Sequence, residues 1–114
     1  MRFKFRKYER LRKEKDFENV FKNGKKRVSD KFIIYFIKNN LLYSRLGISI
    51  KRKIGKANKR NRIKRLIREY FRLNKHKFND MYDFLFVVRP NFDLFDLDSI
   101  TKEIESLLND LIKR

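Results

Sequence analysis

No aspartate or glutamate occurs between Asp30 and Glu69, although this stretch is rich in lysine and arginine. The chain of 114 residues carries 32 basic and 14 acidic residues, a formal net charge of +18. Residues 1–78 hold 28 basic and 6 acidic residues, whereas residues 79–114 hold 4 basic and 8 acidic ones. Self-repulsion on this scale disfavours a compact fold unless a polyanion screens it. The charge therefore predicts nucleic acid as the partner, with an anionic membrane surface as the alternative.

The length of the chain fits one domain, and 41% hydrophobic residues are enough for a small core. The absence of cysteine excludes disulfides and cysteine-ligated zinc, and it fits a reducing compartment. There is no apolar run long enough to span a membrane, and the basic N-terminus lacks the apolar core of a secretion signal. We expect a cytoplasmic protein without a membrane partner. Residues 1–13 are expected to form a flexible basic arm.

Hydrophobic periodicity predicts an α+β domain with the element order α-β-β-β-α-β-α. Gly24 is expected to stop the first helix, and Asp96, Asp98 or Ser99 to cap the last one. In the third strand the small residues Gly47 and Ser49 share one face. This indicates that another part of the molecule or a ligand approaches the strand closely on that face. Helices are expected over 14–23, 57–77 and 97–113, and strands up to about 30 and over 31–38, 45–50 and 82–88.

The long helix combines an apolar arc with a basic surface. Asn61, Arg65, Arg68 and Arg72 follow the spacing i, i+4, i+7, i+11 and form one polar stripe, which Ala57 extends. Arginine can grip phosphate through two hydrogen bonds. The stretch before and within the helix holds ten basic residues: Lys51, Arg52, Lys53, Lys56, Lys59, Arg60, Arg62, Lys64, Arg65 and Arg68.

Two features of this helix favour a function in binding over a solvated charged face. Like charges three or four residues apart repel each other, and cations crowd a helix N-terminus whose dipole prefers anions. Both features become favourable if phosphates occupy the site. A membrane-bound amphipathic helix is the alternative, but the apolar arc is needed to cover the sheet.

The run Arg52–Ala57 followed by Arg60–Glu69, with Arg60–Asn61–Arg62 at its centre, resembles the signature of the bacterial ribonuclease P protein family. The first helix and the order of the later elements also resemble that family, so the match covers nearly the whole chain. The resemblance implies a four-stranded mixed sheet packed with helices and a left-handed β-α-β crossover around the basic helix. Ordinary topology would predict a right-handed crossover.

The resemblance also implies a complex of one protein and one RNA subunit with different roles. The RNA subunit cleaves precursor tRNA at its mature 5′ end with Mg²⁺ bound mainly by the RNA, and the protein supports binding and holds no cofactor. The RNA contacts that the resemblance implies fall on Arg60, Asn61, Arg62, Lys64, Arg65 and Arg68. It assigns the cleft for the single-stranded 5′ leader to Phe17, Phe21, Tyr35, Ser49, Lys53 and Ala57.

The residues themselves support this cleft only in part. Aromatic rings can stack on leader bases without a sequence preference. Phe17 and Phe21, however, also lie on the apolar face of the first helix, so packing in the core is the alternative. Tyr35 alternates with Phe32 and Phe36 and is expected to point to the other face of the sheet.

The sequence contains no recognisable protein active site. His76 is the only histidine and reads as a surface residue, and there is no cysteine nucleophile or His/Asp metal cluster. Asp93, Asp96 and Asp98 lack the spacing of a calcium loop. We therefore expect a non-catalytic subunit of an endoribonuclease. The alternatives are a ribosomal or other structural RNA-binding protein and a protein-only nuclease.

Overall fold

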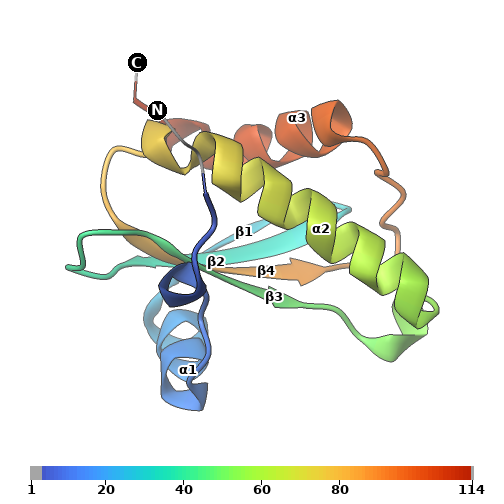
Figure 1. Ribbon diagram of the computed structural model, residues 1–114, viewed down its shortest axis with the longest axis horizontal. Coiled ribbons are helices and arrows are strands. Elements are labelled where there is room, and N and C mark those ends of the chain that lie inside the picture. The colour runs from blue at the N-terminus through green and yellow to red at the C-terminus, as the bar shows by residue number, and fades with distance from the viewer. Residues whose placement is uncertain (1–3, 114) are drawn as a thin grey trace.

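A computed structural model describes residues 4–113 of the chain (Figure 1). The predicted order of helices and strands is confirmed, with three α-helices and four strands joined by short 3₁₀ turns. The helices are α1 (Glu14–Asn23), α2 (Ala57–Asn74) and α3 (Leu97–Leu108), and the strands are β1 (Lys25–Val28), β2 (Phe32–Lys38), β3 (Arg45–Ser49) and β4 (Tyr82–Val88).

The four strands form one mixed sheet in the order β1-β2-β4-β3. β2 pairs antiparallel with β1 and with β4, whereas β3 and β4 are parallel neighbours. The chain passes from β3 to β4 through α2, so α2 forms the crossover of a β-α-β unit. The left hand of this crossover stays a prediction from the family resemblance.

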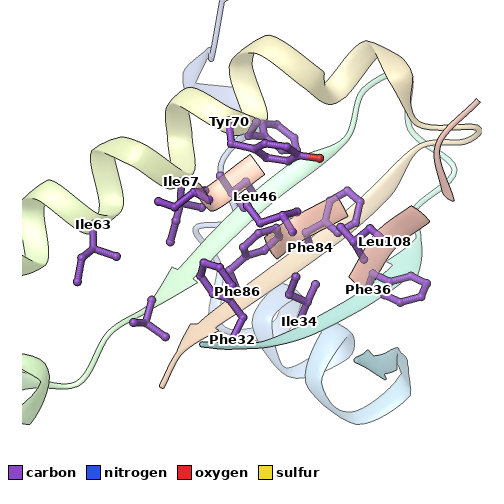
Figure 2. Close-up of a cluster of buried hydrophobic side chains, with 14 of the residues drawn as sticks. Phe32, Ile34, Phe36, Leu46, Ile63, Ile67, Tyr70, Phe84, Phe86 and Leu108 are labelled. Atoms are coloured by element: carbon purple, nitrogen blue, oxygen red, sulfur yellow. The ribbon is translucent and has the colours of Figure 1, made fainter. Parts of the chain in front are cut away.

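Two helices cover one face of the sheet and one helix lies against the other face. Figure 1 shows α2 and α3 on one side and α1 on the opposite side. Side chains of α2 and α3 pack on the first face in a core rich in phenylalanine, shown in Figure 2. Ile63, Ile67 and Tyr70 of α2 are fully buried in this core. The strands contribute Phe32, Ile34, Phe36, Leu46, Phe84 and Phe86.

The second face has a smaller core of Leu11, Val20, Tyr35 and Leu85. Tyr35 points to this face, as its alternation with Phe32 and Phe36 predicted. The small residue Gly47 is explained here, because a Cβ at this position would lie 2.6 Å from the Phe17 ring. The close approach predicted for this face is therefore confirmed: the Phe17 side chain of α1 packs directly on the backbone of β3 at Gly47.

The helix ends differ slightly from the expected ones. α2 ends at Asn74 and α3 at Leu108, and each continues as one 3₁₀ turn. Asp96 caps α3 and accepts a hydrogen bond from the backbone N–H of Ser99 at 2.8 Å. Gly24 ends α1 as predicted, but its φ of −82° and ψ of 167° are extended. The structure needs glycine here because a Cβ would lie 2.4 Å from the Val20 carbonyl oxygen and 2.7 Å from that of Phe36.

Residues 4–13 of the segment predicted to be a flexible arm pack against the domain, whereas residues 1–3 lie outside the described part and the flexibility of the arm stays a prediction. Leu11 is 5% exposed, and its N–H donates to the Leu46 carbonyl oxygen at 3.0 Å. The ring of Phe5 meets that of Phe71 on α2 edge-on, with 5.5 Å between centroids. Burial of apolar side chains and a backbone hydrogen bond therefore hold this segment between β3 and α2.

Candidate nucleic-acid interface

The polar stripe of α2 faces a groove that the N-terminal segment completes. Helical spacing places the four stripe residues on one side of α2, and Phe5 and Arg10 line the groove from the opposite side. Its volume is about 460 Å³. We call it the α2 groove; its lining residues are Phe5, Arg10, Asn61, Arg65, Arg68, Glu69 and Arg72.

The cations of the α2 groove crowd one another. Partial burial lowers the pKa of Arg68, and the nearby positive charge of Arg10 lowers it further. Glu69 pairs with Arg72 across one turn of the helix. Within residues 4–113, no carboxylate forms an ion pair with Arg10, Arg65 or Arg68. These three guanidinium groups are therefore available to bind phosphate oxygens.

A second, smaller groove connects the α2 groove to the face covered by α1. It has a volume of about 160 Å³ and shares Phe5, Arg10 and Arg68 with the first groove. Lys64 of α2 and Phe17 of α1 line it from opposite sides, with Gly47 at its base. The cationic surface therefore continues from α2 towards the aromatic residues of α1.

The aromatic residues of the predicted leader cleft come together on the α1 side of the sheet. Phe21 is 56% exposed, and its ring centroid lies 5.0 Å from that of the buried Tyr35. The Lys26 ammonium lies 5.9 Å from the centre of the Tyr35 ring. Phe17 is partly buried against this core. Packing therefore explains Phe17 in large part, whereas Phe21 contacts Tyr35 but leaves more than half of its surface exposed.

The other three predicted cleft residues lie at the end of β3, in the segment that joins β3 to α2, and at the start of α2. Ser49, Lys53 and Ala57 are all exposed. Lys51 and Arg52 are exposed in the same segment, which contains the 3₁₀ turn Arg52–Ile54. This segment leads into the N-terminus of α2, where no side chain caps the helix. Free N–H groups at such an end favour an anion.

Two predicted RNA-binding residues of α2 lie away from the stripe. The Arg62 guanidinium stands 5.0 Å from the centre of the Phe95 ring and donates to the Phe95 carbonyl oxygen at 3.4 Å. Arg60 has its Nε buried, and this atom has no hydrogen-bond partner among the described residues. The structure therefore brings together Asn61, Arg65, Arg68 and Arg72, and places Arg62 on the flank that faces α3.

Sequence reasoning did not find the part that Phe5, Arg10 and Arg12 play in these grooves. The basic and aromatic residues before α1 were a signal of binding. Their position could not be predicted, because it depends on contacts with β3 and α2 that are distant in sequence.

Two further observations concern alternatives to nucleic-acid binding. Residues 4–113 contain no group of three or more His, Cys, Asp or Glu side chains placed to hold a metal ion. In the same residues, no helix has the length and apolar character needed to cross a membrane.

Comparisons with known proteins agree on one family. The family model for ribonuclease P matches residues 5–112. The ribonuclease P protein component of Fusobacterium nucleatum is 45% identical over 103 residues, covering 90% of this chain and 93% of the relative. The component from Thermotoga maritima is 41% identical over 108 residues, covering 91% and 92%.

Solved structures of ribonuclease P proteins have the same fold. The protein from Staphylococcus aureus superposes with a TM-score of 0.80 at 31% identity, covering 90% of this chain and 94% of that one. The protein from Thermotoga maritima superposes with a TM-score of 0.75 at 40% identity, with the same coverage.

Proposed function

This chain belongs to the ribonuclease P protein family, and from this premise we propose that it binds the catalytic RNA and the 5′ leader of precursor tRNA. In this role it supports cleavage at the mature 5′ end without performing the chemistry itself. A complex of one protein and one RNA in the cytoplasm is part of the same proposal.

The observation that carries the proposal is a set of three guanidinium groups around the α2 groove that form no ion pair within residues 4–113. Arg10, Arg65 and Arg68 lie together without a carboxylate partner within the described chain. The burial of Arg68 increases the cost of leaving these charges uncompensated. A ribose-phosphate backbone in the groove would supply the missing negative charge, so we assign this surface to the catalytic RNA.

We assign the single-stranded leader to the face covered by α1. Phe21, whose ring packs on the buried Tyr35, offers an exposed ring on which an unpaired base can stack, at about 1–3 kcal/mol per base. Lys26 and Lys53 add positive charge for the leader phosphates. Such a surface binds without a sequence preference, which suits a leader that varies from one precursor to another.

We assign the cleavage chemistry to the RNA subunit, with Mg²⁺ bound mainly by that RNA. A metal-dependent protein nuclease needs carboxylates that converge on the ion. Glu69, the acidic residue among those described that line the α2 groove, is instead paired with Arg72. The protein contributes cations that lower the repulsion between RNA phosphates, and this should reduce the Mg²⁺ concentration that the RNA needs.

Reconstitution with a bacterial ribonuclease P RNA tests this function. The full chain should lower the Mg²⁺ concentration needed for cleavage and should favour substrates with a leader over leaderless ones. The protein alone should not cleave precursor tRNA. Cleavage by the protein alone would favour a protein nuclease. Lack of any effect on the RNA-catalysed reaction would favour a structural RNA-binding protein.

A further inference from the structure

A third groove lies on the other side of the N-terminal segment from the α2 groove. The loop between β2 and β3 forms one wall, and the N-terminal segment with the end of α2 forms the other. Its volume is about 260 Å³. We call it the loop groove; the residues that matter here are Lys4, Arg6, Tyr8, Leu42, Tyr43 and Met81.

Hydrogen bonds hold the loop of this groove in one conformation. The Asn39 side chain donates to the Tyr43 carbonyl oxygen at 3.1 Å and accepts from the Leu41 N–H at 2.8 Å. The same amide donates to the buried carboxylate of Asp83 at 2.9 Å. Asn40 adopts a left-handed conformation with φ 58°, which asparagine tolerates well. The loop therefore presents a surface of fixed conformation.

The loop, the N-terminal segment and the residue before β4 together expose apolar and aromatic side chains to solvent around this groove. Leu42 is 94% exposed, Tyr8 51% and Met81 40%. The rings of Tyr8 and Tyr43 meet edge-on, with 4.5 Å between centroids. A fixed apolar group of this kind is unfavourable in water unless a partner covers it.

Positive charge surrounds the aromatic pair. Lys75 pairs with the buried carboxylate of Glu9, so the only acidic residue that lines the groove is already neutralised. Lys4 and Arg6 line the groove, and within residues 4–113 neither forms an ion pair with a carboxylate. The groove therefore combines ring surfaces with two cations that form no ion pair within the described part of the chain.

We propose that the loop groove binds an unpaired nucleotide of RNA. Its base would pack on Tyr8, Tyr43 and Leu42, and its phosphates would contact Lys4 and Arg6. This inference rests on the proposed function, because the RNA would be a component of the same complex. The site is separate from the leader surface, since it lies at the β2–β3 loop and uses neither Phe21 nor Tyr35.

Fluorescence of a single-stranded oligoribonucleotide that contains 2-aminopurine tests this site in the full chain. Stacking quenches this base, so the titration reports base contacts at the loop groove and at Phe21, and the variants of the loop groove separate the two. Leu42→Glu places a negative charge on a side chain that is 94% exposed, and it should not disturb folding. We expect it to weaken binding by about fivefold or more, the loss of at least one stacked base. Tyr43→Ala should have a similar effect, whereas Tyr43→Phe should bind within about twofold of the parent, because the ring is retained.

Ser106→Glu is the matched control, because it adds the same charge at an exposed position on α3. If Leu42→Glu and Ser106→Glu bind the oligonucleotide equally well, the proposal is overturned. It is equally overturned if Leu42→Glu abolishes binding of an acidic protein while RNA binding is unchanged. Reconstituted cleavage by the parent protein is measured in parallel. If the parent protein supports cleavage but the two variants bind the oligonucleotide equally well, only the loop groove is rejected as a site. If the parent protein does not support cleavage, the proposed function is rejected.

Photo-crosslinking from position 42 in the reconstituted complex identifies the source of the nucleotide. One arm carries labelled catalytic RNA and the other labelled precursor tRNA. A crosslink at unpaired nucleotides of either RNA supports the site and assigns its ligand. A crosslink to neither RNA contradicts the proposal.

Discussion

Arg45 on β3 and Asp83 on β4 form a two-pronged ion pair between neighbouring parallel strands. Nε and Nη2 of the guanidinium donate to the two carboxylate oxygens of Asp83 at 2.8 and 2.7 Å. Nη1 reaches Asp16 of α1 at 3.3 Å. The hydrogen bonds to Asp83 raise the pKa of Arg45. One side chain thus joins the edge of the sheet to the helix that carries Phe17 and Phe21.

Replacing Arg45 by methionine should destabilise the domain, because among the described residues it leaves the buried Asp83 carboxylate with only the Asn39 amide as a side-chain donor. The side chain of Asp83 is 3% exposed. We expect the free energy of unfolding in urea to fall by about 3 kcal/mol, the lower end for breaking a buried pair. Lys102→Met removes an exposed pair with Asp98 and should cost less than about 1 kcal/mol. Equal losses for both variants would contradict the structural role of Arg45.

Gly24→Ala should destabilise the junction between α1 and β1. The added methyl would lie 2.4 and 2.7 Å from two backbone carbonyl oxygens, and these cannot move without shifting α1 or β2. Overpacking of this kind costs about 1–3 kcal/mol, measurable by chemical unfolding. Lys22→Ala, at an exposed position of the same helix, should have little effect. A neutral Gly24→Ala would mean that the junction relaxes.

Periodicity predicted the order of the elements because each helix and strand buries one face. The same local chemistry identified Asp96 as a cap candidate and placed Asn61, Arg65, Arg68 and Arg72 on one stripe. These features depend on residues within a few positions of one another, and such patterns can be read directly from a sequence.

Contacts between distant segments could not be predicted in this way. The N-terminal segment is held through Leu46 and Phe71, and nothing local in residues 4–13 indicates those partners. Arg62 is turned towards Phe95, 33 positions further along the chain. Asn74 is buried in the apolar arc of α2, where its side chain donates to the Tyr70 carbonyl oxygen at 2.8 Å. Tertiary packing decided each of these positions.

Phe21→Ala should weaken binding of precursors with a leader and leave folding nearly intact, because the side chain is 56% exposed. Loss of one stacked base corresponds to about 1 kcal/mol or more, roughly fivefold in affinity. The measurement is the dissociation constant of the reconstituted complex for substrates with and without a leader. Phe17→Ala should instead lower stability, because its ring packs against Gly47. Equal effects of Phe21→Ala on both substrates would remove Phe21 from the leader surface.

Asp96→Asn should reduce the dependence of stability on acid pH. Hydrogen bonds from the backbone N–H and hydroxyl of Ser99 hold the pKa of Asp96 below its ordinary value of 3.8. The folded state therefore binds its proton at lower pH than the unfolded state. The stabilisation is fully present above the ordinary pKa and is lost as pH falls through the folded value. The difference in thermal midpoint between parent and variant should therefore shrink as pH decreases below about 4. A difference that stays constant from pH 7 to pH 2 would contradict this role of the cap.

Arg68→Ala should reduce both the affinity for the catalytic RNA and its dependence on salt. Each phosphate contact releases condensed counterion, so the slope of log K against log salt should fall by about 0.7–0.9. Arg68 lies against Arg10 in the α2 groove without a carboxylate partner in the described chain, so its removal also relieves repulsion within the free protein. We therefore expect the variant to be at least as stable as the parent while it binds more weakly. Lys102→Ala removes an exposed cation on α3 and should leave the slope unchanged. If both variants keep the parent slope, Arg68 belongs to a solvated face and the α2 groove is not the phosphate site.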